Sequence, residues 1–598
     1  MDLYNGWFTY DNYNVFSHVL MPYGLSVSLS FKDIPRGTVL HEALIGRKGA
    51  DEEHLHPGMR SWDGTYTAMD MEYHGKQVRV ETASTGEELV MLISQAEFSY
   101  VPLTLLVSAS MLWNRPGVTS RVDETTLSAT VDDRTFHIFV NGTPIREMNA
   151  NMRCPFVSFA LDKPVVVTVG TPAKSVEEVR VILDEAAAKV KAESARYGEL
   201  AEAYEALRAC MAWDTIYEPT NEQLCTPVSR IWNIQWGGYV LFCWDTFFSA
   251  SMAALASKEL AYANVYGILN EITENGFVPN FGSRAGTSRD RSQPPVGSMT
   301  VLGLYRKFGE ADFVASVFDC LLTWNRWFKE HRMLENGTLC WGSEPFEPRY
   351  GNYWELFDLN CTLGGALESG LDNSPMYDDI PFDSERHIMK LADVGLTGLY
   401  IEDCEALAEL AGIIGRETEK AKLLARAEHA KDGLDSLWNE KLGIYCNRRT
   451  DTGEFSTRLS PTMFYALYSD RVSDERVQRM LSEHFYNEEE FMGEYIMPSI
   501  TRSDPAYGDQ NYWRGRIWAP MNYLAYNAMK KRGLEEACGV LAEKSRDLLL
   551  KEWREHGHVH ENYNGTTGEG DDVLNSDGFY HWGALLALIA IDNAGLSE

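Results

Sequence analysis

Apolar and polar positions alternate, or apolar residues form short runs, along the first 175 residues. Leu25–Phe31 alternates strictly between apolar and serine positions. Leu89–Ile93 and Val165–Val169 are short apolar or β-branched runs, and Phe136–Val140 ends at Asn141-Gly142, a turn sequence. Such runs, separated by Gly, Asn, Asp and Pro, are typical of β-strands joined by turns. We expect an N-terminal antiparallel β-sandwich domain over residues 1–175.

The pattern changes near Ser175. From Val176 to Trp213 the chain is rich in Ala, Glu, Lys, Arg and Leu and has a long helical period. We interpret residues 176–215 as a helical linker that packs on the segment after it.

From residue 216 to the end, apolar residues recur at helical spacing in about twelve stretches, and β signals are scarce. The stretches are 238–256, 259–274, 295–307, 311–330, 354–369, 392–414, 417–438, 460–468, 473–484, 513–530, 534–551 and 579–594. Six helical hairpins closed into a toroid account for this number. We therefore expect an all-α (α/α)6 barrel over 216–598, with loops at one end long enough to build a site.

Five of the expected connections are rich in aromatic residues, glycine and carboxylates. They are 275–295, 333–353, 370–383, 498–518 and 556–582. Loops this dense in Trp, Tyr and Asp favour a binding function over packing alone.

Charge narrows the class of partner. The chain has 54 basic and 87 acidic residues and a formal charge of −33. Binding to nucleic acid or to an anionic membrane surface needs a basic face, so we expect neither partner. A small neutral carbohydrate would be unaffected. The 16 tryptophans favour a sugar mildly, because flat rings pack on pyranose faces but large cores use them too.

The N-terminal sequence MDLYNGWFTYDNYN has neither a basic segment nor an apolar one, so it is not typical of a signal peptide. No run of about 18 apolar residues predicts a membrane span. The 10 cysteines are scattered and form no CxxC pair. We interpret them as reduced thiols and expect a cytoplasmic protein. The oligomeric state has no signal in the sequence.

Hydrolysis of a glycoside needs two carboxyl groups on either side of the scissile bond. Asp372 follows an expected helix end at Gly370, and Glu561 precedes the Gly-rich loop 565–570. Taken alone, Asp372 also suits a turn and Glu561 an exposed loop carboxylate. Glu569, Asp571 and Asp572 are rival carboxylates in the same loop, where oxygen-rich side chains also suit a structural Ca²⁺.

Two further segments mix rings with polar groups. Tyr512–Trp518 is expected to open a helix, in which Arg514 could brace a carboxylate and the tryptophans could stack on sugar. Asp245 lies in the otherwise apolar stretch Trp244–Phe248, where a buried carboxyl must be hydrogen-bonded or near solvent.

Other chemistries have little support. The chain lacks HExxH, a phosphate-binding P-loop and a GxSxG motif. His54-Leu-His56 and His558-Val-His560 are His-x-His pairs, but no third and fourth zinc ligands can be assigned to them. We expect no metal site and no cofactor requirement for catalysis.

Five motifs occur together in one order: Trp244–Phe248, Ser292–Pro295, Ser369–Pro375, Tyr512–Trp518 and Glu561–Asn564. Over about 230–598 the chain resembles glycoside hydrolase family 63, which includes processing α-glucosidase I, bacterial α-glucosidases and mannosylglycerate hydrolases. Trehalases are similar over the same motifs. The first 175 residues resemble the N-terminal β-sandwich of such enzymes only in their pattern of short apolar runs and turns, and not in specific motifs.

The resemblance implies an (α/α)6 barrel and an inverting mechanism, with Asp372 as general acid and Glu561 as general base. It implies that a further set of residues contacts the sugar: Trp244, Asp245, Gln293, Asn373, Trp513, Arg514, Trp518 and Trp582. One departure is Met376-Tyr377, where many members have Arg-Trp or Arg-Phe.

The expected function is therefore an exo-acting inverting glycoside hydrolase that releases a terminal α-linked sugar. Glucose is favoured, and mannose stays an open alternative. A glycoside phosphorylase is an alternative, although phosphate would replace the base and Glu561 argues against it. A non-catalytic carbohydrate-binding protein is another, which the presence of both carboxylates disfavours.

Overall fold

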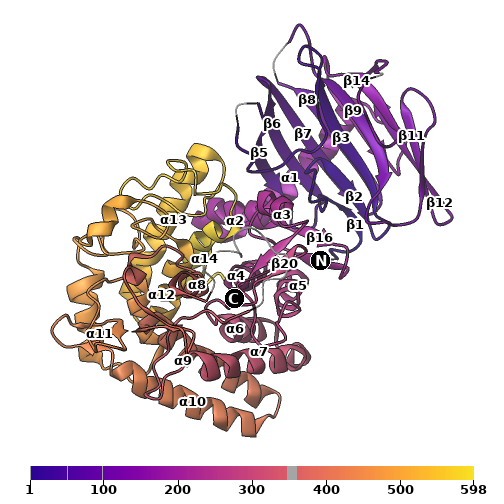
Figure 1. Cartoon of the computed structure of the whole chain (residues 1–598). Coiled ribbons are helices and arrows are strands. Elements are labelled where there is room, and N and C mark those ends of the chain that lie inside the picture. The colour runs from indigo at the N-terminus through magenta and orange to yellow at the C-terminus, as the bar shows by residue number, and fades with distance from the viewer. Residues whose placement is uncertain (1, 50, 97–98, 148, 347–359, 598) are drawn as a thin grey trace. The chain divides into compact units, whose positions relative to one another are not determined.

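The computed structural model describes residues 2–49, 51–96, 99–147, 149–346 and 360–597. Contacts between Cα atoms divide the chain into two compact units, Met1–Gln235 and Trp236–Glu598. The first contains the indigo and violet strands of Figure 1, and the second contains the red to yellow helices. The predicted domain boundaries at 175 and 215 stay predictions.

The first unit contains two antiparallel sheets, which confirms the predicted antiparallel β region. One sheet has the order β1 (Gly6–Phe8), β2 (Ser17–Met21), β3 (Leu25–Asp33), β9 (Thr104–Met111), β14 (Phe156–Ala160) and β13 (Thr143–Pro144), with β4 (Thr38–Leu40) beside β3. The other has the order β10 (Val118–Arg121), β11 (Thr126–Val131), β12 (Arg134–Asn141), β15 (Val165–Val169), β8 (Glu88–Gln95), β7 (Lys76–Thr85), β6 (Tyr66–Tyr73) and β5 (His54–Arg60).

The two sheets meet through buried side chains. His18 of β2 lies 3.1 Å from Thr82 of β7, between their Nε2 and Oγ1 atoms, and both residues are buried. The turn at Asn141-Gly142 does not close a hairpin. It carries the chain from β12 in one sheet to β13 in the other.

The helix after the sheets packs on the sheet before it as well as on the chain after it. In α1 (Val176–Ser194), Leu183 and Val190 pack in one apolar cluster with Tyr66 and Leu92 of the eight-stranded sheet. The segment also packs on the chain after it, as predicted, since Arg208 of the next helix donates to the carbonyl of Val190. The apolar stripe of α1 covers the outer face of a sheet that the preceding strands leave open.

Further elements of the first unit come after α1. They are a 3-10 turn (Ala195–Leu200), α2 (Ala201–Asp214), β16 (Ile216–Glu218), β17 (Gln223–Cys225) and α3 (Arg230–Gln235). Buried Arg230 of α3 donates from Nε to the carbonyl of Trp213, 2.6 Å away, and so joins α3 to the end of α2.

The second unit is mainly helical. Its helices are α4 (Cys243–Ala253), α5 (Lys258–Leu269), α6 (Gly297–Phe308), α7 (Ala311–His331), α8 (Thr362–Ser369), α9 (Val394–Ile413), α10 (Glu417–Asp435), α11 (Asp474–Arg479), α12 (Ala519–Lys531), α13 (Glu535–His556) and α14 (Leu585–Asn593). Short 3-10 or π segments are η3 (Pro375–Tyr377), η4 (Pro461–Tyr468), η5 (Met480–Phe485), η6 (Pro505–Asp509) and η7 (His581–Ala584).

Short strands connect these helices, more of them than the sequence pattern indicated. They are β18 (Val240–Phe242), β19 (Phe281–Ser283), β20 (Gly286–Thr287), β21 (Phe382–Asp383), β22 (Ile388–Met389), β23 (Leu391–Ala392), β24 (Trp438–Asn439), β25 (Ile444–Tyr445) and β26 (Arg448–Arg449).

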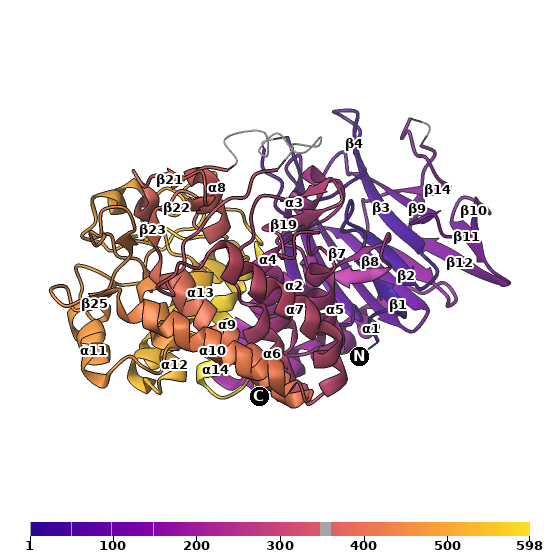
Figure 2. The same ribbon diagram turned by 60° about the horizontal axis from the view of Figure 1, so that its bottom comes forward.

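Six helical elements succeed one another around a closed circuit of contacts. α4 contacts α6, α6 contacts α9, α9 contacts η4, η4 contacts α12, α12 contacts α14, and α14 contacts α4. We call these six elements the inner ring. α9 and α14 are apolar on nearly all sides, as helices enclosed by others must be. Figure 2 shows α10 lying along α9, on the outside of this ring.

The expected helix over 513–530 begins late, because the residues before α12 are not helical. The N–H of Trp513 donates to Oδ1 of Asn373 at 2.8 Å, and the N–H of Ile517 donates to the carbonyl of Tyr563 at 2.7 Å. Backbone donors used in this way are not available for a helix. The expected stretch 354–369 appears as α8, and its part over 354–359 lies outside the described residues.

The contact between α9 and η4 depends on a glycine. A Cβ atom on Gly398 would lie 2.3 Å from the carbonyl oxygen of Tyr465, whereas one on exposed Gly303 of α6 would meet no atom within 4 Å. We expect Gly398→Ala to destabilise the unit by about 1–3 kcal/mol through overpacking. Gly303→Ala should stabilise α6 by up to about 1 kcal/mol.

Circular dichroism during thermal unfolding checks this pair. Gly398→Ala should lower the unfolding temperature, and Gly303→Ala should leave it unchanged or raise it. Equal shifts in the two variants would contradict the close contact between α9 and η4.

Candidate active site

The predicted site residues lie where the chain enters the helices of the inner ring. Asp245 is the third residue of α4, Gln293 precedes α6, and Trp518 directly precedes α12. Trp582 is in η7, which leads into α14. Because these positions are all near helix N-termini, they belong to one end of the ring.

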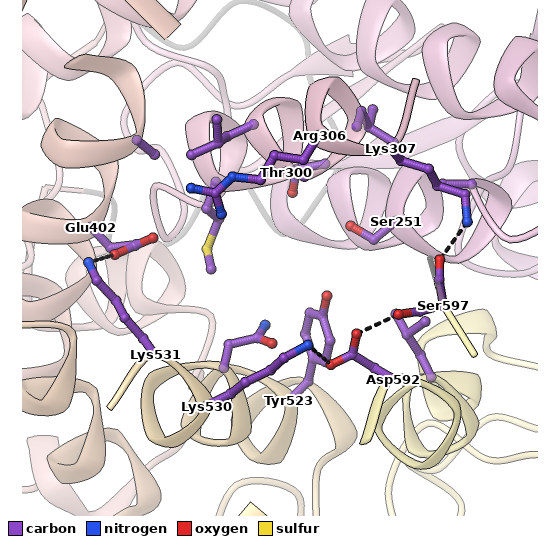
Figure 3. Close-up of a pocket in the computed structure, with 18 of the residues that line it drawn as sticks. Ser251, Thr300, Arg306, Lys307, Glu402, Tyr523, Lys530, Lys531, Asp592 and Ser597 are labelled. Carbon is purple, nitrogen blue, oxygen red and sulfur yellow. Dashed lines mark hydrogen bonds and ion pairs between the residues drawn. The ribbon is translucent and has the colours of Figure 1, made fainter. Parts of the chain in front are cut away.

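A cavity of about 980 Å³ lies at the other end. It is lined from the C-terminal parts of the same helices, by residues such as Ser251, Arg306, Lys530 and Asp592 (Figure 3). Many of its charges are paired, as in the 2.6 Å contact of Lys530 with Asp592. None of the predicted site residues lines this cavity.

Glu561 is buried, with 3% of its surface exposed, and its carboxyl group lies between the Tyr512 hydroxyl and the Asp577 backbone. The hydroxyl of Tyr512 donates to its Oε1 at 3.0 Å, and the N–H of Asp577 donates to Oε2 at 3.4 Å. Burial raises the pKa of Glu561 well above its usual range, and the charges of Asp577 and Asp372 raise it further. The hydrogen bond from Tyr512 opposes this rise.

Asp372 follows the C-terminal Gly370 of α8. That glycine has φ of 73°, and a Cβ there would lie 2.6 Å from the Trp244 ring, so the position requires glycine. Burial raises the pKa of Asp372 to about 6, while the Arg291 guanidinium opposes the rise. A carboxyl group with this pKa can hold a proton close to neutral pH.

Asp245 is a third carboxyl group in the same environment. Its Oδ1 accepts a hydrogen bond from the hydroxyl of Tyr580 at 3.2 Å, and its side chain is buried. Burial raises the pKa of Asp245 to about 8; the Tyr580 bond opposes this, and the charge of Asp372 adds to it. Since Asp372 acts electrostatically on both Asp245 and Glu561, the structure brings all three carboxyl groups together.

Four tryptophans form an aromatic cluster around these groups. Trp513 stacks on Trp518 with 3.6 Å between ring centroids, and Trp244 and Trp582 lie 6.3 Å from Trp513. Trp518 is fully buried and packs behind Trp513, while the Nε1–H of Trp513 has no hydrogen-bond acceptor among the described residues. Trp582 donates from Nε1 to the carbonyl of Glu561 at 2.8 Å and so holds its backbone.

Two amides join the segments of the site. Oε1 of Gln293 accepts the N–H of Trp244 at 3.2 Å. Asn373 accepts the N–H of Trp513 through Oδ1 and donates through Nδ2 to the carbonyl of Asn511 at 3.2 Å. The neighbour of Asp372 in the chain thus fixes the segment that carries Trp513.

A buried ion pair holds the same region from behind. Glu368, on the last turn of α8, pairs with Arg332 at 2.7 Å. Its two oxygens also accept the N–H groups of Ser292 at 3.1 Å and Gly342 at 2.7 Å. Glu368 therefore joins the segment before Gln293 to the helix before Asp372.

Arg514 points to carboxylates other than the predicted catalytic pair. Its Nη1 lies 3.0 Å from Asp378 and its Nε lies 2.7 Å from Asp509. Sequence reasoning does not identify three contributors to the site: Tyr512, Tyr580 and Arg291. Tyr512 opens one of the five motifs, but no sequence signal shows where a tyrosine hydroxyl points.

The rival carboxylates of the Gly-rich loop have other partners. Glu569 pairs with Lys551 at 2.9 Å, and Asp572 pairs with Arg516 at 2.8 Å. Asp571 contacts histidines, which do not suit Ca²⁺. The calcium ion stays a prediction.

Comparison with known proteins places the chain in a family. A family model described as mannosylglycerate hydrolase MGH1-like glycoside hydrolase domain matches residues 238–582. The chain belongs to this family. The matched residues include every predicted site residue from Trp244 to Trp582, as well as the Tyr512 and Tyr580 hydroxyl donors.

Two named relatives match parts of this MGH1-like chain. Mannosylglycerate hydrolase MGH1 of Selaginella moellendorffii is 22% identical over 421 residues, which cover 60% of this chain and 81% of the relative. The probable mannosyl-oligosaccharide glucosidase of Schizosaccharomyces pombe is 25% identical over 330 residues, 52% of this chain. The match spans only 38% of that relative's length.

The fold of the whole MGH1-like chain is similar to that of a bacterial glucoamylase whose crystal structure was solved in complex with acarbose. The TM-score is 0.51 at 10% identity, and the match covers 100% of this chain and 95% of that one. The likeness includes both units. In the described residues, no helix is long and apolar enough to cross a membrane.

The raised pKa of Asp245 predicts a pH-dependent stability. Asp245 titrates near 3.9 in an unfolded chain, but its pKa is about 8 in the folded protein. Between these values the folded chain binds more protons, so its stability falls as pH rises, by up to about 1.4 kcal/mol per pH unit. Asn at this position can still accept the Tyr580 bond but does not titrate.

We therefore expect Asp245→Asn to unfold at a higher temperature than the wild type, by a margin that grows from about pH 5 to about pH 8. Thermal unfolding at a series of pH values measures this margin. Asp547→Asn, at an exposed position of α13, is the control and should leave the pH dependence unchanged. A margin for Asp245→Asn that does not grow with pH would contradict the assignment.

Proposed function

We propose that the protein is an exo-acting inverting α-glycosidase that releases a terminal α-linked glucose from an oligosaccharide or small glucoside. The observation that carries the proposal is the grouping of Asp372 and Glu561 with the four tryptophans at one end of the inner ring. The family description, a glycoside hydrolase domain, favours hydrolysis over phosphorolysis.

In this proposal Asp372 is the general acid. A pKa of about 6 lets it keep a proton near neutral pH and give it to the glycosidic oxygen as the bond breaks. The surrounding rings support the role, because exclusion of water favours the protonated form of a carboxyl group.

Glu561 is the general base, which takes a proton from the attacking water. Burial raises the pKa of Glu561, and the Tyr512 hydroxyl and the Asp577 N–H, which both donate to it, oppose this rise by favouring the charged form that a base needs. Inversion requires the two carboxyl groups to be about 6.5–9.5 Å apart, with one water between Glu561 and the sugar.

Asp245 and the aromatic cluster are assigned to sugar binding. With a pKa of about 8, Asp245 is largely protonated at neutral pH and can donate to, as well as accept from, a sugar hydroxyl. The buried N–H of Trp513 is a second donor for a hydroxyl group. A neutral sugar suits this environment because it adds no charge to three carboxyl groups.

We also infer that the inner ring belongs to an (α/α)6 barrel and that the N-terminal sheets form a β-sandwich. The closed order of contacts among six helical elements supports the barrel, with α5, α7, α10 and α13 supplying outer helices. A cytoplasmic location is part of the proposal, because scattered cysteines without CxxC pairs are typical of proteins that keep their thiols reduced.

Replacing the base separates catalysis from binding. Glu561→Gln keeps the size and can accept the Tyr512 bond, but it cannot take a proton from water. We expect turnover to fall by about 10²–10⁴-fold or more, with substrate binding retained. Glu569→Gln in the same loop is the matched control and should keep wild-type turnover. Steady-state kinetics and calorimetric binding measure the two effects; equal activities in both variants would contradict the role of Glu561.

The stereochemistry of the first product tests the mechanism. A screen over α-linked disaccharides and glucosylglycerate- and mannosylglycerate-type substrates identifies the sugar, and proton NMR follows the anomer that forms first. We expect β-glucose from an α-glucoside. An α-anomer would mean retention, with a nucleophilic carboxylate and a separation of about 5–5.5 Å. Phosphate-dependent formation of a sugar phosphate would instead support a phosphorylase.

A further inference from the structure

Next to Glu561 in the chain, the His558-Val-His560 pair lies close to the carboxylate of Asp571. His558, His560 and Asp571 each offer one ligand atom, and these atoms all lie within 4.8 Å of one another. Sequence spacing alone assigns no third ligand to this pair. The Gly-rich loop folds back over it and places Asp571 Oδ1 2.7 Å from His560 Nε2.

Each of the three side chains has an outer partner that orients it. His558 Nδ1 lies 3.2 Å from the carbonyl of Val559, which leaves Nε2 as the ligand atom. His556 Nδ1 lies 3.2 Å from the second oxygen of Asp571. Such outer partners fix the tautomer and direction of metal ligands.

His560 has the strongest outer partner. Its side chain is fully buried, and its Nδ1 lies 3.1 Å from Oε2 of Glu552. The angle between the two groups is not that of a hydrogen bond, so the contact is an ion pair when His560 is protonated. Glu552 is also fully buried and pairs with Lys551 at 3.0 Å. A carboxylate behind one nitrogen of a histidine, with the other nitrogen toward a shared point, is the arrangement of many zinc sites.

Glycines make room for both rings. A Cβ on Gly570 would lie 2.1 Å from Cγ of His560, and one on Gly578 would lie 2.9 Å from Cε1 of His558. The two imidazoles therefore occupy space that any other residue at these positions would fill. Asp571 is 46% exposed, which leaves a path from solvent to the ligand atoms.

We propose that His558, His560 and Asp571 bind a divalent transition-metal ion of the zinc class. Two imidazoles and one carboxylate suit Zn²⁺ and exclude Ca²⁺ and Mg²⁺, which take oxygen ligands. Zinc bonds of about 2.0–2.2 Å separate neighbouring ligand atoms by roughly 3.3 Å, so the three side chains need small movements to close on an ion. Water completes the coordination on the exposed side.

The ion would be structural. Glu561 directly follows His560, but the two side chains have different neighbours. His560 faces Glu552, and Glu561 faces Tyr512. The metal thus holds the backbone from which Glu561 projects without touching the sugar, and its binding does not depend on the proposed glycosidase activity.

The test is zinc binding by the full chain after dialysis against EDTA. Isothermal titration with Zn²⁺ and elemental analysis should show one ion per chain, and the unfolding temperature should rise on adding Zn²⁺. His558→Gln and Asp571→Asn should each weaken binding by more than about 100-fold. Cobalt in place of zinc should give a visible absorption band in the wild type but not in His558→Gln or Asp571→Asn.

The other His-x-His pair supplies the matched control. His54 and His56 are exposed on β5, so the double variant H54Q/H56Q should bind zinc as the wild type does. Circular dichroism in EDTA shows whether each variant is folded. An ion-pair network without metal affinity, or zinc retained at full affinity in both His558→Gln and Asp571→Asn, would overturn the proposal.

Discussion

Burying Asp245, Asp372 and Glu561 together is unfavourable, because each charge is removed from water and repels the other two. The helical unit offsets part of this cost through hydrogen bonds. Tyrosine hydroxyls from Tyr512 and Tyr580 donate to two of the carboxyl groups. The pKa values of all three groups are still raised by burial, and the value of about 8 at Asp245 leaves a proton on that group at neutral pH. The same effect of burial at Asp372 favours the protonated form, which is the form that the proposed general acid needs.

A fourth buried carboxylate has the opposite character. Glu368 pairs with Arg332 and accepts two backbone N–H groups. One positive charge and two hydrogen-bond donors therefore stabilise its negative charge. Glu368 joins two segments that carry predicted site residues, Gln293 and Asp372. It is buried as Asp245 and Glu561 are, so burial does not distinguish Glu368 from the predicted site carboxylates. Their hydrogen-bond and ion-pair partners do.

The sequence predicts the elements and residues that depend on local pattern. The alternation in Leu25–Phe31 appears as β3, and the motifs around Asp245, Asp372 and Glu561 meet in one place. Prediction fails where long-range contacts decide. The segment before α12 gives its backbone donors to Asn373 and Tyr563, and no periodicity reveals that. The third ligand beside His558-Val-His560 escapes prediction for the same reason, because loop closure brings it there.

The hydrogen bond between Tyr580 and Asp245 joins residues 335 positions apart. α14 also contacts α4, the first helix of the inner ring. The ring therefore closes between its first and its last helical elements along the chain. During synthesis, Asp245 and the apolar face of α4 lack these partners until Tyr580 and α14 have been made. Such long-range closure slows folding and exposes apolar surface meanwhile, so this unit is expected to depend on chaperones more than the N-terminal sheets do.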